Sequence, residues 1–146
     1  MSKIESFKML IDGEWCDASD SKTFDSFDPS TTKVWSNVPE ATAEDVNRAV
    51  DAAYRAGEEG PWKGMTPTQR GRCLRRLGDL LADKSEDLGR IETRDTGKMF
   101  KETRWQAQYI SEFFHFYAGC ADKIHGDTLP IDKPDLFVFT KREPLG

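Results

Sequence analysis

The stretch 100–118 is predicted to be a helix that is apolar on two opposite faces, because its apolar residues recur at helical spacing in two separate rows. One row is Ala107, Ile110, Phe114 and Tyr117, and the other is Trp105, Tyr109, Phe113, Phe116 and Cys120. A helix of this kind needs packing partners on both sides. A chain of 146 residues offers few candidates for the second layer, so part of this apolar surface is expected to lack cover.

The composition is that of a folded chain. A domain of this size can bury roughly 70% of its unfolded surface, and 4 Trp and 9 Phe are available for a core. The charged residues are mixed in sign and the pI is near 5.1, which argues against a protein that coats nucleic acid. No apolar run approaches the roughly twenty residues that span a bilayer, and residues 1–10 do not resemble a signal peptide. We therefore expect a cytoplasmic protein with no nucleic-acid or membrane partner.

Extended segments are predicted near both ends of the chain. Asp12-Gly13 tolerates the positive φ angles of a tight hairpin turn, and Asp28-Pro29 favours a second turn. The predicted strand pairs are 8–11 with 14–16, 23–27 with 33–38, and 128–131 with 136–142.

Two further helices are predicted between these strands. Thr42 caps the first, which Gly57 and Gly60-Pro61 are expected to stop. Thr66-Pro67-Thr68-Gln69 is a capping box with proline at the first helical position, and it begins a single helix that ends near Gly97. The apolar stripe of that helix is Leu74, Leu77, Leu81, Leu88 and Ile91, supported by Cys73 and Leu80.

No catalytic group can be assigned from these residue patterns alone. No two glycines lie two residues apart, so the dinucleotide-binding fingerprint is not present in the sequence. The cysteines are interpreted as small packing residues, the histidines as packing or surface residues, and a basic cluster as a solvated helix face. These residues are Cys16, Cys73 and Cys120; His115 and His125; and Arg70, Arg72, Arg75 and Arg76.

An ordered set of motifs resembles the aldehyde dehydrogenase superfamily over essentially the whole chain. The segments include Met9-Leu10-Ile11-Asp12-Gly13-Glu14-Trp15, Phe27-Asp28-Pro29-Ser30-Thr31, Pro61-Trp62, Glu92-Thr93-Arg94-Asp95-Thr96-Gly97-Lys98, Tyr117-Ala118-Gly119 and Thr140-Lys141-Arg142-Glu143-Pro144-Leu145-Gly146. Asp28 stands where the family has asparagine, Thr32 where it has glycine, and Cys120 where it usually has tryptophan.

The resemblance implies an α/β fold: the amino-terminal hairpins and helices of an aldehyde-dehydrogenase-like cofactor domain plus an extended oligomerisation hairpin, with the Rossmann core and catalytic domain missing. Residues 1–124 would form the amino-terminal part of the dinucleotide-binding domain and 125–142 the oligomerisation hairpin. Residues 143–146 would begin the return into the cofactor domain. The hairpin implies a homo-oligomer, either a dimer or a tetramer.

The resemblance also implies oxidation of a small aldehyde to a carboxylic acid through a cysteine thioester, with NAD or NADP as cofactor. The family's catalytic asparagine, lysine, glutamate and cysteine would all follow Gly146. None of the three cysteines here has the family's nucleophile context, so no catalytic or cofactor-binding residue is assigned. The 146-residue chain alone is expected to be inactive and to bind neither cofactor nor cation tightly.

One site is implied within the chain, a monovalent cation held by the backbone carbonyls of Ser26 and Phe27 and by the carboxylate of Asp95. The alternative interpretation of Asp95 is a turn residue at a helix end that bonds its own backbone. Two other hypotheses concern the whole chain: a non-catalytic interaction or scaffold module that keeps only the assembly surface, and a truncated reading frame without function.

Overall fold

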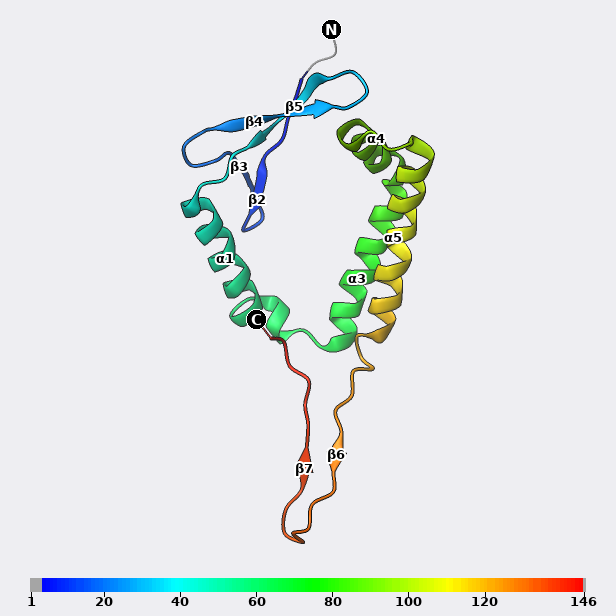
Figure 1. Cartoon of the computed structure of the whole chain (residues 1–146). Coiled ribbons are helices and arrows are strands. Elements are labelled where there is room, and N and C mark those ends of the chain that lie inside the picture. The colour runs from blue at the N-terminus through cyan, green and yellow to red at the C-terminus, as the bar shows by residue number, and fades with distance from the viewer. Residues whose placement is uncertain (1–3, 146) are drawn as a thin grey trace.

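The computed structural model describes residues 4–145, which form short strands at both ends and five helices between them (Figure 1). In chain order the elements are β1 (Glu5–Ser6), β2 (Met9–Ile11), β3 (Glu14–Cys16), β4 (Thr23–Asp28), β5 (Lys33–Pro39), α1 (Ala43–Glu58), α2 (Pro61–Gly64), α3 (Pro67–Asp83), α4 (Ser85–Thr96), α5 (Phe100–Cys120), β6 (Thr128–Leu129) and β7 (Val138–Phe139).

The strands form small separate sheets rather than one continuous sheet. β5 lies between β4, to which it is antiparallel, and β1, to which it is parallel. β2 and β3 form the predicted hairpin, and its turn residues Asp12 and Gly13 have φ angles of 55° and 81°. These positive angles match the right-handed twist of the paired strands. β1 was not predicted, because it contains only Glu5 and Ser6 and has no hydrophobic pattern.

The prediction of a single helix from Thr66 to Gly97 is wrong, because the structure has two helices in this segment. Lys84 interrupts it with φ −98° and ψ 7°, which ends α3 and begins α4. The bend lets α4 contact β4 as well as α5, whereas α3 packs mainly along α5. The apolar spacing continues across the bend, so periodicity could not reveal it. The start of α3 at the capping box of Thr66 and Gln69 is confirmed.

Small residues, and not the leucine stripe, form the contact between the antiparallel helices. The buried positions are Gly71, Gly78, Ser85 and Gly89 on α3 and α4, and Thr103, Ala107 and Ser111 on α5. A Cβ placed on Gly89 would lie 2.7 Å from the backbone of Arg104, which shows how closely the helices approach. Leu77, Leu88 and Ile91 are consequently exposed on the surface of this helix pair rather than buried in it.

The helices do not pack into one compact layer, and α1 keeps an apolar face that no other element within residues 4–145 covers. α1 packs mainly against α2 and β2, and it stands apart from α3 and α5 in Figure 1. Its apolar face is exposed, with Val46 at 52% and Tyr54 at 67%. The accessible surface is 11691 Å², against about 7,600 Å² for a compact monomer of this mass. The chain therefore buries about half of its unfolded surface, less than the expected 70%.

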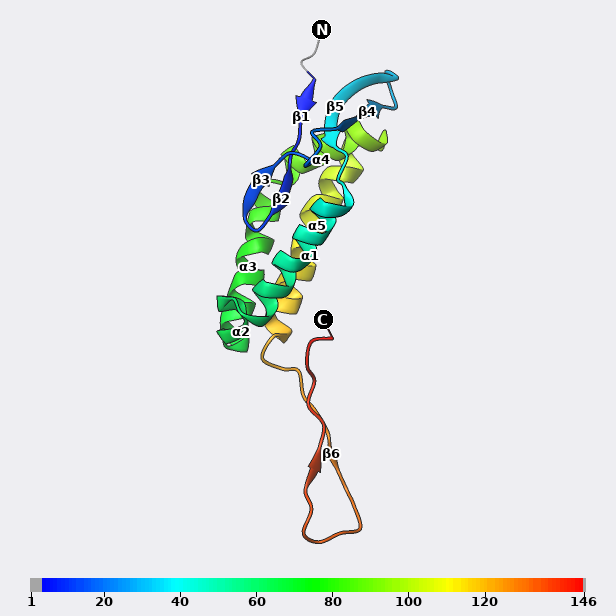
Figure 2. The same cartoon turned by 90° about the vertical axis from the view of Figure 1, so that its left-hand side faces the viewer.

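The carboxyl-terminal hairpin projects from the end of the helix pair, as both views show (Figures 1 and 2). Its ladder is short: Thr128 pairs with Phe139 and Leu129 with Val138. The predicted strands 128–131 and 136–142 are longer, and Pro130 explains part of the difference because it lacks the N–H that a ladder requires.

The amino terminus of α1 is tied to the preceding loop by the buried carboxylate of Asp45. Its Oδ2 accepts from the backbone N–H groups of Ser19 and Thr42, each at 3.0 Å, and from both hydroxyls. The backbone donors of Ser19 and Thr42 lower the pKa of Asp45 from 3.8 to about 2, although burial acts in the opposite direction. The hydrogen bonds of the folded chain thus favour the ionised form of the Asp45 carboxyl group.

We expect Asp45→Asn to destabilise the chain at pH 7 and to do so less as the pH falls. A carboxyl group with a lowered pKa contributes stability that is complete above about pH 4 and is lost toward pH 2, where it is protonated in the folded chain as well. Urea unfolding followed by circular dichroism between pH 7 and pH 2 measures the difference. Asp51→Asn, on the exposed part of the same helix, is the control and should resemble the wild type. A wild-type advantage that stays constant down to pH 2 would contradict this assignment.

Candidate functional site

Two of the three predicted cation ligands meet where the sheet touches α4. Ser26 belongs to β4 and Asp95 to the last turn of α4, and the Ser26 hydroxyl donates to Oδ1 of Asp95 at 2.5 Å. Phe27 follows Ser26 in β4, so its backbone lies beside the same contact. Residues 69 apart in the sequence are thereby joined.

A β-bulge lies at this point, and the sequence did not indicate it. Ser26 pairs with Ser36 and Phe27 with Val34, so Trp35 is an extra residue on β5. A bulge breaks the alternation of side chains and re-aims the residue that it inserts. Trp35 and Ser36 are consequently both buried, at 4% and 0% exposed, although they are neighbours in one strand.

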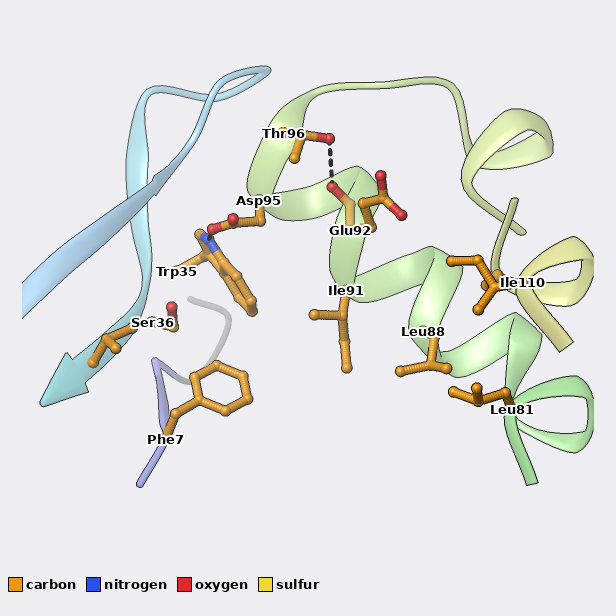
Figure 3. Close-up of a pocket in the computed structure, with 12 residues that line it drawn as sticks. Phe7, Trp35, Ser36, Leu81, Leu88, Ile91, Glu92, Asp95, Thr96 and Ile110 are labelled. Atoms are coloured by element: carbon orange, nitrogen blue, oxygen red, sulfur yellow. Dashed lines mark hydrogen bonds between the residues drawn. The ribbon is translucent and has the colours of Figure 1, made fainter. Parts of the chain in front are cut away.

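Trp35 completes a hydrogen-bonded cluster with Ser26 and Asp95. Its indole Nε1–H points at both oxygens, 3.2 Å from Oγ of Ser26 and 3.3 Å from Oδ1 of Asp95. Phe7 meets the ring edge-on at 5.7 Å, and the guanidinium of Arg94 lies over the ring at 5.1 Å. The cluster connects β4, β5 and α4, and Figure 3 shows Trp35 beside Asp95.

The alternative interpretation of Asp95 as a residue that bonds its own helix end is wrong. Its hydrogen bonds go to the sheet, while Thr96 makes the local contact by donating to the carbonyl of Glu92 at 2.7 Å (Figure 3). Both bonds to Asp95 end on Oδ1, and within residues 4–145 no hydrogen bond reaches Oδ2. A carboxylate oxygen without a hydrogen bond is the kind of ligand that a hard cation takes.

A cavity of about 500 Å³ opens next to this cluster (Figure 3). Its walls are mainly apolar and come from Phe7, Trp35, Leu88, Ile91 and Ile110. Ser36 also lines it, and the buried hydroxyl oxygen of this residue has no hydrogen-bond partner in residues 4–145. Such a cavity accepts apolar groups, and the ionisable side chains in its lining are the carboxylates of Glu92 and Asp95.

The other candidate residues have packing or surface positions. Cys73 is exposed, so its interpretation as a packing residue is wrong, whereas Cys16 and Cys120 are half-buried. His115 joins α5 to α3 through Nε2, which lies 3.0 Å from Oδ1 of Asp79. His125 is exposed at the base of the hairpin.

The predicted solvated helix face is observed for three of the four arginines in the basic cluster, namely Arg72, Arg75 and Arg76. Arg70 is half-buried instead and donates to the carbonyl of Met65 at 2.6 Å. In the part of the chain that the structure describes, no three side chains of the His, Cys, Asp and Glu types gather as a metal site. None of the helices described combines the length and apolar character that crossing a membrane requires.

Comparison with known sequences gives a consistent family. The model described as "Aldehyde dehydrogenase family" matches residues 15–146. (Z)-2-((N-methylformamido)methylene)-5-hydroxybutyrolactone dehydrogenase of Acinetobacter baylyi is 43% identical over 143 residues, which are 98% of this chain and 29% of that protein. Aldehyde dehydrogenase family 2 member B4, mitochondrial, of Arabidopsis thaliana is 43% identical over 140 residues, 95% of this chain and 26% of that protein. The chain thus spans 26–29% of the length of these relatives.

Comparison with solved structures confirms the predicted fold class. The NAD+ complex of aldehyde dehydrogenase from Bacillus cereus superimposes with a TM-score of 0.92 at 37% identity, over 97% of this chain and 29% of that chain. The NAD-dependent aldehyde dehydrogenase from Sinorhizobium meliloti gives a TM-score of 0.86 at 31% identity, over 92% and 27%. These strands and helices are therefore similar to the amino-terminal portion of such enzymes.

Proposed function

Since the chain belongs to the aldehyde dehydrogenase family, we propose that it is the amino-terminal segment of an NAD(P)-dependent enzyme that oxidises an aldehyde to a carboxylic acid through a cysteine thioester. The observation that carries this proposal is the match over residues 15–146 together with the superposition on an NAD+ complex over 97% of the chain. In this proposal the nucleophilic cysteine, the base and the oxyanion donor belong to polypeptide outside residues 1–146.

The role proposed for these residues is structural support of the cofactor domain. The exposed apolar face of α1 and the apolar cavity between β5 and α4 support it, because surfaces of that kind need to be covered by further protein. The residues present do not fit a dinucleotide site, since the sequence has no glycine-rich phosphate loop. No step of the reaction is therefore assigned to this chain.

The proposal also includes a homo-oligomer formed through the hairpin 125–142 and a cytoplasmic location. The hairpin projects from the helix pair and exposes Phe137 at 73% and Phe139 at 63%, which suits a contact with another subunit (Figure 2). The cytoplasmic location rests on the sequence alone.

The 146-residue chain alone is expected to give no aldehyde oxidation. Purified protein with NAD or NADP and a panel of aliphatic, aromatic and amino aldehydes should show no reduced cofactor above the blank in absorbance at the nicotinamide band. As a positive counterpart, residues 1–146 replace the matching segment of the Acinetobacter relative, and this chimera should reduce NAD when given an aldehyde. Turnover by the 146-residue chain that survives repurification and disappears with Cys120→Ser would overturn the proposal.

We also propose that Ser26, Phe27 and Asp95 hold a monovalent cation. Asp95→Ala removes the only side-chain carboxylate in this set, so potassium should no longer stabilise a complete enzyme that carries residues 1–146 against heat. Thermal melts in potassium chloride and in choline chloride of equal ionic strength measure the effect. The control is Asp79→Ala, which removes a carboxylate that pairs with His115 away from this site. If potassium raises the melting temperature of Asp95→Ala and of the wild type equally, the proposal is wrong.

A further inference from the structure

We propose that Trp35 is the positioning residue of this cation site, and that its indole N–H sets the orientation of the Asp95 carboxylate. The inference rests on the proposed cation role of Ser26, Phe27 and Asp95. It names a residue outside that ligand set, which would act through Asp95 and Ser26 without touching the ion.

The hydrogen bonds of Trp35 assign different roles to the two carboxylate oxygens of Asp95. Oδ1 accepts from the indole at 3.3 Å and from the Ser26 hydroxyl at 2.5 Å. Two donors on one oxygen fix the rotation of the carboxylate, and Oδ2 is left for another positive partner. The same indole N–H also points at Oγ of Ser26 at 3.2 Å, so it orients the residue whose carbonyl is a proposed ligand.

The bulge is what brings the indole to this place. In a regular strand Trp35 and Ser36 would face opposite sides, because side chains alternate. Here the extra residue falls opposite the step between Ser26 and Phe27, and both Trp35 and Ser36 are buried on the helix side. The position of the register shift therefore links the indole to the two carbonyls proposed as ligands.

Two neighbours hold the ring itself in place. Phe7 packs edge-on against it, and Arg94 lies over its face while pairing with Glu5 at 2.9 Å. Trp35 is 4% exposed, so little of its surface is open to water. An indole fixed in this way presents its donor in one direction, which a flexible polar side chain would not do.

The test separates donation of the hydrogen bond from simple packing. Trp35→Phe keeps an aromatic ring but removes the N–H, and it should raise the potassium concentration at the midpoint of thermal stabilisation about tenfold. Phe7→Leu is the matched control, since it loosens the same ring contact and leaves the hydrogen bonds. It should lower the melting temperature in choline chloride without moving the potassium midpoint.

Ser26→Ala is a second variant in case Trp35→Phe does not fold, because it removes the hydroxyl shared by Trp35 and Asp95 and keeps the backbone carbonyl. It should also raise the potassium midpoint. If the wild type shows no potassium response, the proposed cation site itself is wrong. If the wild type responds and neither variant shifts the midpoint, or Phe7→Leu shifts it equally, the cation site stands and the positioning role of Trp35 is overturned.

Discussion

The 146-residue chain by itself is expected to elute as dimers or larger species rather than as a monomer of 16.6 kDa. Its accessible surface exceeds that of a compact monomer by about 4,000 Å², which is more than the roughly 1,000–2,500 Å² that each partner buries in an obligate interface. The exposed surface includes the apolar face of α1, the aromatic rows of α5 and the hairpin. Surfaces of this size and character drive association.

Size exclusion coupled to light scattering measures this state. Phe137→Lys combined with Phe139→Lys removes two exposed aromatic side chains, and the species should shift toward smaller ones. Asp132→Lys combined with Asp135→Lys adds lysines to the same hairpin but keeps the aromatic residues, so it should leave the association largely intact. A sharp monomer peak with cooperative unfolding would show that the chain covers its own apolar surface. That outcome would favour the independent interaction module over a segment of an enzyme.

Gly89→Ala is expected to cost about 3 kcal/mol of stability and to lower the melting temperature by roughly 10 °C. The added Cβ would lie 2.7 Å from both N and Cα of Arg104, so α5 must move away from α4. That movement also disturbs the buried Thr103, whose hydroxyl donates to the carbonyl of Gly89 at 2.9 Å. A backbone obstacle cannot be relieved by a change of side-chain rotamer.

The matched control is Gly119→Ala, since Gly119 lies in α5 and a Cβ added there would meet no atom within 4 Å. Alanine has the higher helix propensity, so this variant should equal or exceed the wild type by up to about 1 kcal/mol. Thermal unfolding followed by circular dichroism compares the three proteins. If Gly89→Ala has the same melting temperature as the wild type, α4 and α5 do not approach each other as closely as the contact between Gly89 and Arg104 indicates.

Local signals in the sequence predicted the elements well. The Asp12-Gly13 turn, the cap at Thr42 and the capping box at Thr66 are each confirmed, because each depends on residues within a few positions. α5 is confirmed as well and ends two residues beyond its predicted end, at Cys120.

Burial could not be predicted in the same way, because it depends on contacts between distant segments. The leucine stripe of α3 and α4 resembles a core stripe, yet small residues occupy the contact with α5. Helix periodicity shows which residues share a face, and it does not show which face the partner helix approaches. The bend at Lys84 was not predicted because the apolar spacing continues across it.

The candidate site was found in part through the resemblance. It named Ser26 and Asp95, and the structure brings these two side chains into contact. The resemblance did not indicate Trp35, and neither did the strand pattern, because a bulge inserts one residue without a local sequence signal. The run Val34-Trp35-Ser36 alternates too weakly to reveal a register shift.

The uncovered apolar surface of the molecule has a consequence for biosynthesis. If the complete enzyme has the length of the Acinetobacter relative, the ribosome has to add about 350 further residues after this segment. At 5–20 residues per second, translation of those residues lasts about 20–70 s after residue 146 has been added. The hairpins and helix pair form from nearby segments in far less time. The nascent chain would therefore present Val46, Tyr54 and the aromatic rows of α5 to solvent until later residues cover them, which would make it a substrate for chaperones that hold apolar surface.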